Sequence, residues 1–179
     1  PACPKELIGR RGKQDDGSAK TRQAYLGCVF TQHGVDHKGR PLRDHESTTY
    51  VSSMAPINDF GPMLRQEAIR RGMGQVPQVV LLIDGAAGLE GMGYDCFSQS
   101  TQIVDFYHAM EHGGKVLEAL LGDKRRPEYE RRRRHWAHRL LNNGVETLIR
   151  QAREESAGKP NQAAVEKELG YFVDNVNRM

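Results

Sequence analysis

Two short apolar segments of the sequence each stop on an aspartate. The first covers 79–83 and ends at Asp84, which Gly85 follows, and the second covers 101–104 and ends at Asp105. Short apolar runs of this kind predict buried strands, and ligands collect at the carboxyl ends of strands in an α/β sheet. An aspartate directly after each of two predicted strands therefore predicts an active site at this edge of the sheet.

Asp84 has two interpretations. Its carboxylate is a hard oxygen ligand of the kind that Mg²⁺ and Mn²⁺ prefer, and Gly85 lets the chain turn at once beside a substrate. Alternatively, Asp84 only ends the strand and caps the next helix, which is the more common role of such an aspartate in proteins. The residue types leave both interpretations open.

A second pattern follows Asp105: His108, Glu111 and His112 have the spacing His-x-x-Glu-His. On a helix this spacing places two imidazoles one turn apart beside a glutamate, as in one class of zinc proteases. No third zinc ligand stands out downstream, and only helices are expected there, where a protease would have a sheet. A zinc metallohydrolase is therefore the weaker alternative.

Basic residues are concentrated in two parts of the sequence, and both are candidates for contacts with DNA phosphates. The first is a glycine-rich loop over 9–22, in which the backbone can approach a phosphate closely. The second is a helix expected from Pro127 to Gly144, which includes four consecutive arginines. The candidate residues are Arg10, Arg11, Lys13, Lys20 and Arg22 in the loop, and Arg131 and Arg134 in the helix.

Each basic cluster also has a simpler interpretation. The loop is then an exposed segment without a role, and the arginines, with Glu128 and Glu130 nearby, form a solvated and partly salt-bridged helix face. Trp136 of the same helix either stacks on a base or, four residues before Leu140, packs into the core. The sequence leaves both alternatives open.

Length and composition limit the class of protein. A chain of 179 residues suffices for one ordinary domain with a helical extension, and a hydrophobic fraction of 37% predicts a modest core. The net charge of +3 is compatible with binding to nucleic acid. The widely spaced Cys3, Cys28 and Cys96 argue against a disulfide framework or a structural zinc site. No apolar run approaches the length of a membrane span.

The hydrophobic pattern predicts an α/β fold with a helical C-terminal part. Strands are expected within 22–32 and 47–55, paired antiparallel, and at 79–83 and 101–104. Asn58 is the expected N-cap of a helix that ends near Gly72. Further helices are expected over 106–121, from Pro127 to Gly144, from Val145 onward, and after a linker at 157–160.

Several segments, in their order along the chain, resemble the central part of Kra-type bacterial insertion-sequence transposases. The matching segments are 9–22, 26–32, 47–51, 84–86, 102–112 and 170–172, with Asn175. The resemblance implies a ribonuclease-H-like fold of the retroviral integrase type. Its mixed sheet would be incomplete and would lie within 1–114, and a helical insertion would occupy 115–179.

The resemblance also implies an activity. In that family three acids hold Mg²⁺ or Mn²⁺ for DNA strand cleavage and strand transfer. Asp84 matches the second acid, which is a metal ligand, and Asp105 and His108 match an Asp/Cys-x-x-His element that precedes the inserted helices. The implied partners are transposon ends, target DNA and, in the complete enzyme, a second copy of the chain, but no membrane. The implied location is the bacterial cytoplasm, at the nucleoid.

The family pattern leads us to expect its first aspartate before Pro1 and its final glutamate after the helix that contains Tyr171 and Phe172. One acid cannot hold two Mg²⁺ ions, so the isolated chain is expected to be inactive. The chain would then be a fragment of a DNA transposase. The alternative is a decayed or domesticated remnant that binds DNA without cutting it.

Overall fold

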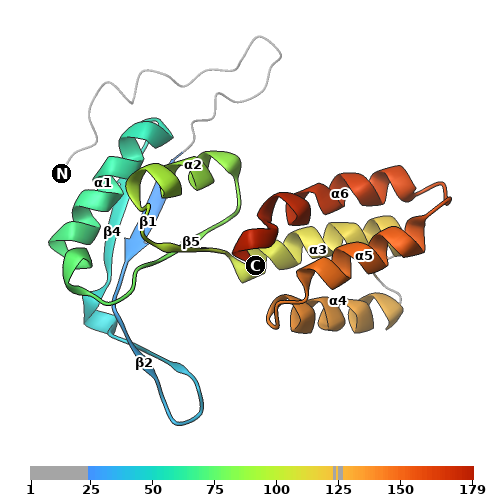
Figure 1. The fold of residues 1–179 in the computed structure, drawn as a ribbon, viewed down its shortest axis with the longest axis horizontal. Coiled ribbons are helices and arrows are strands. Elements are labelled where there is room, and N and C mark those ends of the chain that lie inside the picture. Colours follow the sequence, from blue (N-terminus) through green and yellow to red (C-terminus); the bar gives the residue numbers. More distant parts are fainter. Residues whose placement is uncertain (1–23, 123, 125–126) are drawn as a thin grey trace. The chain divides into compact units, whose positions relative to one another are not determined.

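The computed structural model describes residues 24–122, 124 and 127–179, and it has an α/β fold (Figure 1). The chain divides into two compact units, 1–71 and 72–179, and each is described by itself. The domain boundary expected after residue 114 falls inside a helix of the second unit, α3 (Phe106–Leu121). Within the described residues the strands form three separate two-stranded sheets.

The first unit combines two antiparallel strand pairs with one long helix. Its elements are β1 (Tyr25–Val29), β2 (Gln32–Val35), β3 (Pro41–Arg43), the 3₁₀ helix η2 (His45–Ser47), β4 (Thr49–Ser53) and α1 (Ile57–Arg70). Strands β1 and β4 pair antiparallel, from Tyr25 opposite Ser53 to Val29 opposite Thr49. This confirms both predicted strands and their pairing.

The hairpin of β2 and β3 was not predicted, since this segment was expected to be a polar stretch with a turn. Both strands are exposed, so no apolar alternation marks them in the sequence. The tip is organised locally: Asp36 Oδ1 accepts hydrogen bonds from the backbone N–H groups of Lys38 and Arg40, each at 2.8 Å. An aspartate that bonds the backbone two residues later is typical of a turn.

Helix α1 covers one face of the β1–β4 pair. Phe60 and Leu64 are buried there, and the ring of Phe60 stacks on Tyr25 with centroids 5.3 Å apart. A Cβ at Gly27 would lie 2.5 Å from Leu64 Cδ1, so the close approach of helix and strand requires glycine. The expected N-cap was wrong by two residues: Pro56, whose ring presets its φ angle, occupies the N-cap position instead of Asn58.

The second unit begins with a strand–helix–strand motif and continues as a helical bundle. Its elements are η3 (Met73–Gln75), β5 (Val80–Ile83), α2 (Ala87–Cys96), β6 (Thr101–Val104), α3, α4 (Pro127–Leu140), α5 (Val145–Ser156), α6 (Gln162–Asn175) and η4 (Val176–Arg178). Strands β5 and β6 pair in parallel, from Val80 opposite Thr101 to Ile83 opposite Val104. Strands β5 and β6 and helices α3 to α6 agree with the sequence prediction.

The bundle helices α3 to α6 share one hydrophobic core, and Figure 1 shows α3, α5 and α6 running side by side. Phe172 and Leu117 lie at its centre with no exposed surface. Val104, the last residue of β6, belongs to the same core. The parallel strand pair is therefore anchored to the bundle by burial of apolar surface.

No helix among the described residues combines the length and the apolar character that a membrane crossing requires.

The core assignment can be tested with two leucines of the bundle. Leu117 is fully buried, whereas 66% of Leu141 is exposed. We expect Leu117→Ala to lower the free energy of unfolding by about 2–5 kcal/mol, because it leaves a cavity. The matched control, Leu141→Ala, should change it by about 0.5 kcal/mol or less. Chemical denaturation followed by circular dichroism measures both, and equal losses in the two variants would contradict the assignment.

Candidate functional site

The carboxyl ends of β5 and β6 bring Asp84 and Asp105 together. Because Ile83 pairs with Val104, these aspartates are the next residues on two neighbouring strands. The backbone N–H of Asp105 donates to the carbonyl oxygen of Ile83 at 2.7 Å, which continues the ladder to the aspartate. Neighbouring strands are about 4.8 Å apart, so the two acids occupy one edge.

Each aspartate uses one carboxylate oxygen to hold the backbone that follows it. Asp84 Oδ1 accepts from the N–H of Ala86 at 2.9 Å, and Asp105 Oδ1 accepts from the N–H of His108 at 2.8 Å. Asp105 is thereby the N-cap of α3. Asp84 is not the N-cap of α2, because Ala86 has that position and makes no side-chain capping bond. A carboxylate has four lone-pair sites, so both acids keep capacity for a metal ion.

The far end of the chain contacts the turn after β5. The hydroxyl of Tyr171 in α6 donates to the backbone carbonyl oxygen of Asp84 at 3.0 Å. Asn175 Nδ2 donates to the carbonyl oxygen of Tyr171 at 2.7 Å, and Arg178 donates to Asn175 Oδ1 at 2.5 Å. Tyr171 and Asn175 lie in segments that carry the family resemblance, but the sequence assigned them no role.

Gly85 is required where α6 meets this turn. Its φ angle is +85°, in the left-handed region that glycine adopts without strain. A Cβ at this position would lie 2.8 Å from Asn175 Oδ1 and 3.0 Å from the hydroxyl oxygen of Tyr171. The backbone conformation and the packing therefore both exclude a larger residue.

Two imidazoles of α3 line the same region. The ring of His112 stacks on Tyr171, with centroids 3.7 Å apart and planes within 1° of parallel. His108 meets both rings edge-on, with centroids 5.0 Å from His112 and 5.7 Å from Tyr171. Of the site residues predicted from the sequence, the structure thus brings together Asp84, Asp105 and His108.

Burial shifts the pKa of both stacked rings away from the charged form. It lowers the pKa of His112, and electrostatic repulsion from Lys115 and His108 lowers it further. Burial, together with the charge of Asp84, raises the pKa of Tyr171 to about 12. The phenol therefore keeps its proton and its capacity to donate.

The geometry does not assemble a zinc site from the His-x-x-Glu-His pattern. Glu111 is exposed, and its Oε1 lies 3.6 Å from Nζ of Lys115 on the outer side of α3. Over the described ranges, no group of three or more histidine, cysteine, aspartate or glutamate side chains is arranged to hold a metal ion. Asp84 and Asp105 fit Mg²⁺ or Mn²⁺ by ligand chemistry, but as a partial set of two carboxylates.

The predicted DNA contacts have different outcomes. Arg131 and Arg134 are exposed on α4, although Arg131 lies 3.9 Å from Glu128. Trp136 of the same helix is buried against Phe172, with ring centroids 5.3 Å apart, so its interpretation as a base-stacking residue was wrong and its core interpretation is confirmed. The loop candidates lie outside the described residues; these are Arg10, Arg11, Lys13, Lys20 and Arg22.

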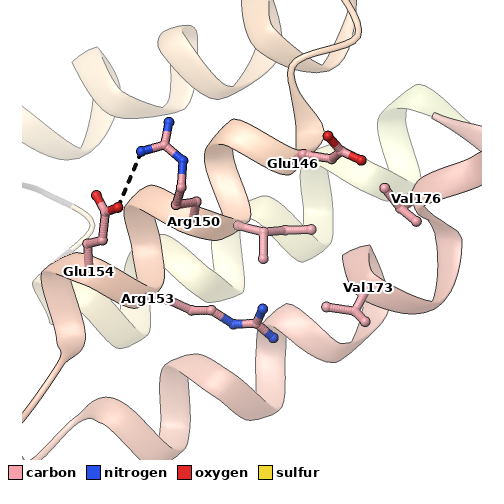
Figure 2. A pocket seen from close by; sticks show the side chains of 7 residues that line it. Glu146, Arg150, Arg153, Glu154, Val173 and Val176 are labelled. Atoms are coloured by element: carbon pink, nitrogen blue, oxygen red, sulfur yellow. Dashed lines mark hydrogen bonds and ion pairs between the residues drawn. The ribbon is translucent and has the colours of Figure 1, made fainter.

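A hollow of about 390 Å³ lies on the bundle, bordered by α5, α6 and η4 (Figure 2). Its lining residues are Glu146, Ile149, Arg150, Arg153, Glu154, Val173 and Val176, and none of them is a predicted site residue. Its arginines are already paired: Arg150 with Glu154 at 3.2 Å, and Arg153 with Glu166. Mixed, internally neutralised charge does not indicate a specific ligand.

No family model, curated protein or solved structure matches the chain. The resemblance to Kra-type transposases therefore stays a prediction from the sequence segments quoted above.

The turn after β5, which carries Asp84, is closely packed. We therefore expect any side chain at position 85 to destabilise the fold. We expect Gly85→Ala to lower the free energy of unfolding by about 1–3 kcal/mol, because it forces an alanine into the left-handed region. In Gly91→Ala, an added Cβ in the middle of α2 meets no atom within 4 Å. This control should be stabilised by about 0.5–1 kcal/mol, since alanine favours a helix. Urea denaturation of both variants distinguishes them, and an unchanged Gly85→Ala protein would contradict the geometry.

Proposed function

We propose that this chain is part of the catalytic core of a Kra-type DNA transposase with a ribonuclease-H-like fold, in which Asp84 is a metal-binding acid. One observation carries the proposal: Asp84 and Asp105 end two neighbouring parallel strands in register, on the strand–helix–strand motif where the resemblance assigns its acid and its Asp-x-x-His element. In α/β sheets, ligands bind at this edge.

The residues at this edge have different roles. Asp84 and Asp105 offer carboxylate oxygens to a divalent cation, and Gly85 allows the turn after β5 to pack closely against Tyr171 and Asn175 of α6. His108 holds Asp105 in place through its backbone N–H, at 2.8 Å from Oδ1. When bound, Mg²⁺ or Mn²⁺ would activate a water or a 3′-hydroxyl and stabilise the leaving oxygen in phosphodiester chemistry.

Two carboxylates make a weak site. Mg²⁺ retains several waters and binds poorly to few protein ligands, and the described residues offer no third acidic or imidazole ligand at this edge. We therefore expect weak metal binding and no DNA nicking from the isolated chain.

Helix α4 is the part of the described chain best suited to DNA. Its Arg131, Arg133 and Arg134 are exposed, whereas Arg132 is held by Glu128 at 3.5 Å and by Glu155 at 2.5 Å. The exposed guanidinium groups can contact phosphates, which supply most of the affinity in sequence-independent DNA binding. Arg132 instead serves to join α4 to α5.

This exposed basic helix also favours the second candidate function, a DNA-binding remnant without catalysis. Both candidates bind DNA, and both would act at the bacterial nucleoid in the cytoplasm; the complete transposase would bring together two copies on paired transposon ends. Only the transposase requires a metal at Asp84, so metal binding distinguishes the two.

Metal binding can be located by NMR with Mn²⁺, whose unpaired electrons broaden the signals of nearby amides. We expect broadening at Gly85 and Asp105 in the full chain of 179 residues. Asp84→Asn should weaken the binding about tenfold or more, because it removes a charged ligand. Asp174→Asn, which removes an exposed carboxylate of α6, is the matched control and should bind as wild type does. Broadening that persists unchanged in Asp84→Asn would refute the assignment.

The DNA interface predicts a salt dependence that differs between two arginines. Arg134→Ala should reduce the slope of log K against log salt concentration by about 0.9, the value for one lost phosphate contact. Arg150→Ala removes the same charge from an exposed arginine that is paired with Glu154, and it should leave the slope unchanged. Fluorescence anisotropy with duplex DNA measures both, and equal slopes in wild type and Arg134→Ala would count against α4 as the interface.

A further inference from the structure

The turn that carries Asp84 is held by a residue 87 positions later in the chain. The hydroxyl of Tyr171 bonds the carbonyl oxygen of Asp84 itself, and the next amide but one, that of Ala86, bonds the Asp84 carboxylate. The peptide group that accepts the bond from Tyr171 therefore lies between Cα of Asp84 and the amide of Ala86, which orients the Asp84 carboxylate. Restricting this peptide restricts the carboxylate.

Tyr171 is itself held in two ways. One face stacks on His112, and Phe172, the neighbour of Tyr171 in sequence, is fully buried in the bundle core. A tyrosine held by stacking and by the burial of its neighbour loses little further entropy when its hydroxyl forms a bond. The hydroxyl is thus already oriented toward the turn.

A second connection joins α6 and η4 to the other side of the turn. Arg178, whose side chain is 5% exposed, forms an ion pair with Glu90 at 3.2 Å and also donates to Asn175. Glu90 lies in the first turn of α2, directly after the acid-bearing turn. A buried arginine tolerates burial only when it is paired, so this contact maintains the position of α2 against η4.

We infer that Tyr171 is a positioning residue for the Asp84 carboxylate, acting through the carbonyl oxygen of Asp84 and supported by the stacked ring of His112. The inference rests on the proposed function, because it gives Tyr171 its role through a metal ligand. It makes the affinity of Asp84 for a metal ion depend on the placement of α6, an element of the helical bundle.

Tyr171→Phe tests this inference, since it removes the hydroxyl and keeps the ring. We expect the amide of Ala86 to exchange with solvent about fivefold faster, and the Mn²⁺ affinity at Asp84 to fall by about the same factor, as expected for one lost neutral hydrogen bond. Tyr107→Phe is the matched control, because Tyr107 is 81% exposed on α3, and both quantities should keep their wild-type values. The thermal midpoint is recorded for every variant, so that a loss of affinity can be compared with a loss of stability.

His112→Ala provides a second test, for the case that Tyr171→Phe does not fold. It removes the stacked ring, keeps the hydroxyl, and should shift both quantities in the same direction by a smaller factor. Wild-type exchange at Ala86 in a folded Tyr171→Phe protein, or in His112→Ala if only that variant folds, would overturn the inference, whether or not Mn²⁺ binds. Absence of Mn²⁺ binding in the wild-type chain would instead refute the proposed function, and the exchange rates would still decide the role of Tyr171.

Discussion

The parallel pairing of β5 with β6 is the constraint on which the candidate site depends. Its register places Ile83 opposite Val104, so the residue that follows each strand is an aspartate at the same edge. A shift of one residue would turn the side chains of one strand to the opposite face and separate the two carboxylates. The register is maintained by burial, because Ile83 and Val104 are the buried residues of their strands and the residues before them are more exposed.

The helical bundle completes this edge instead of forming a separate structure beside it. Burial of Phe172 determines where α6 lies, and the position of α6 brings Tyr171 to the carbonyl oxygen of Asp84. The packing of the bundle therefore also stabilises the turn after β5, which carries Asp84. A substitution deep in the bundle can consequently alter the geometry of the acids without contacting them.

Most of the elements could be predicted from the sequence because local signals mark them: apolar runs that stop at Asp84 and Asp105, and the strong helix boundaries Gly122 and Pro127. The β2–β3 hairpin could not, since it buries no apolar residue and is organised by Asp36. The bond from Tyr171 to Asp84 could not either, because a hydroxyl-to-carbonyl contact between distant segments leaves no local pattern. The two acids were predicted; the group that holds one of them was visible only in the structure.

We propose that Asp84 and Asp105 form one metal-binding edge. A crystal structure with Mn²⁺ tests it most directly, because anomalous scattering locates this ion independently of any assumption about its ligands. We expect a peak about 2 Å from a carboxylate oxygen of Asp84, with Asp105 on the same side of the ion. A peak at His108 and His112 instead, or an ordered Asp84 with no Mn²⁺ at a concentration that occupies weak sites, would contradict it.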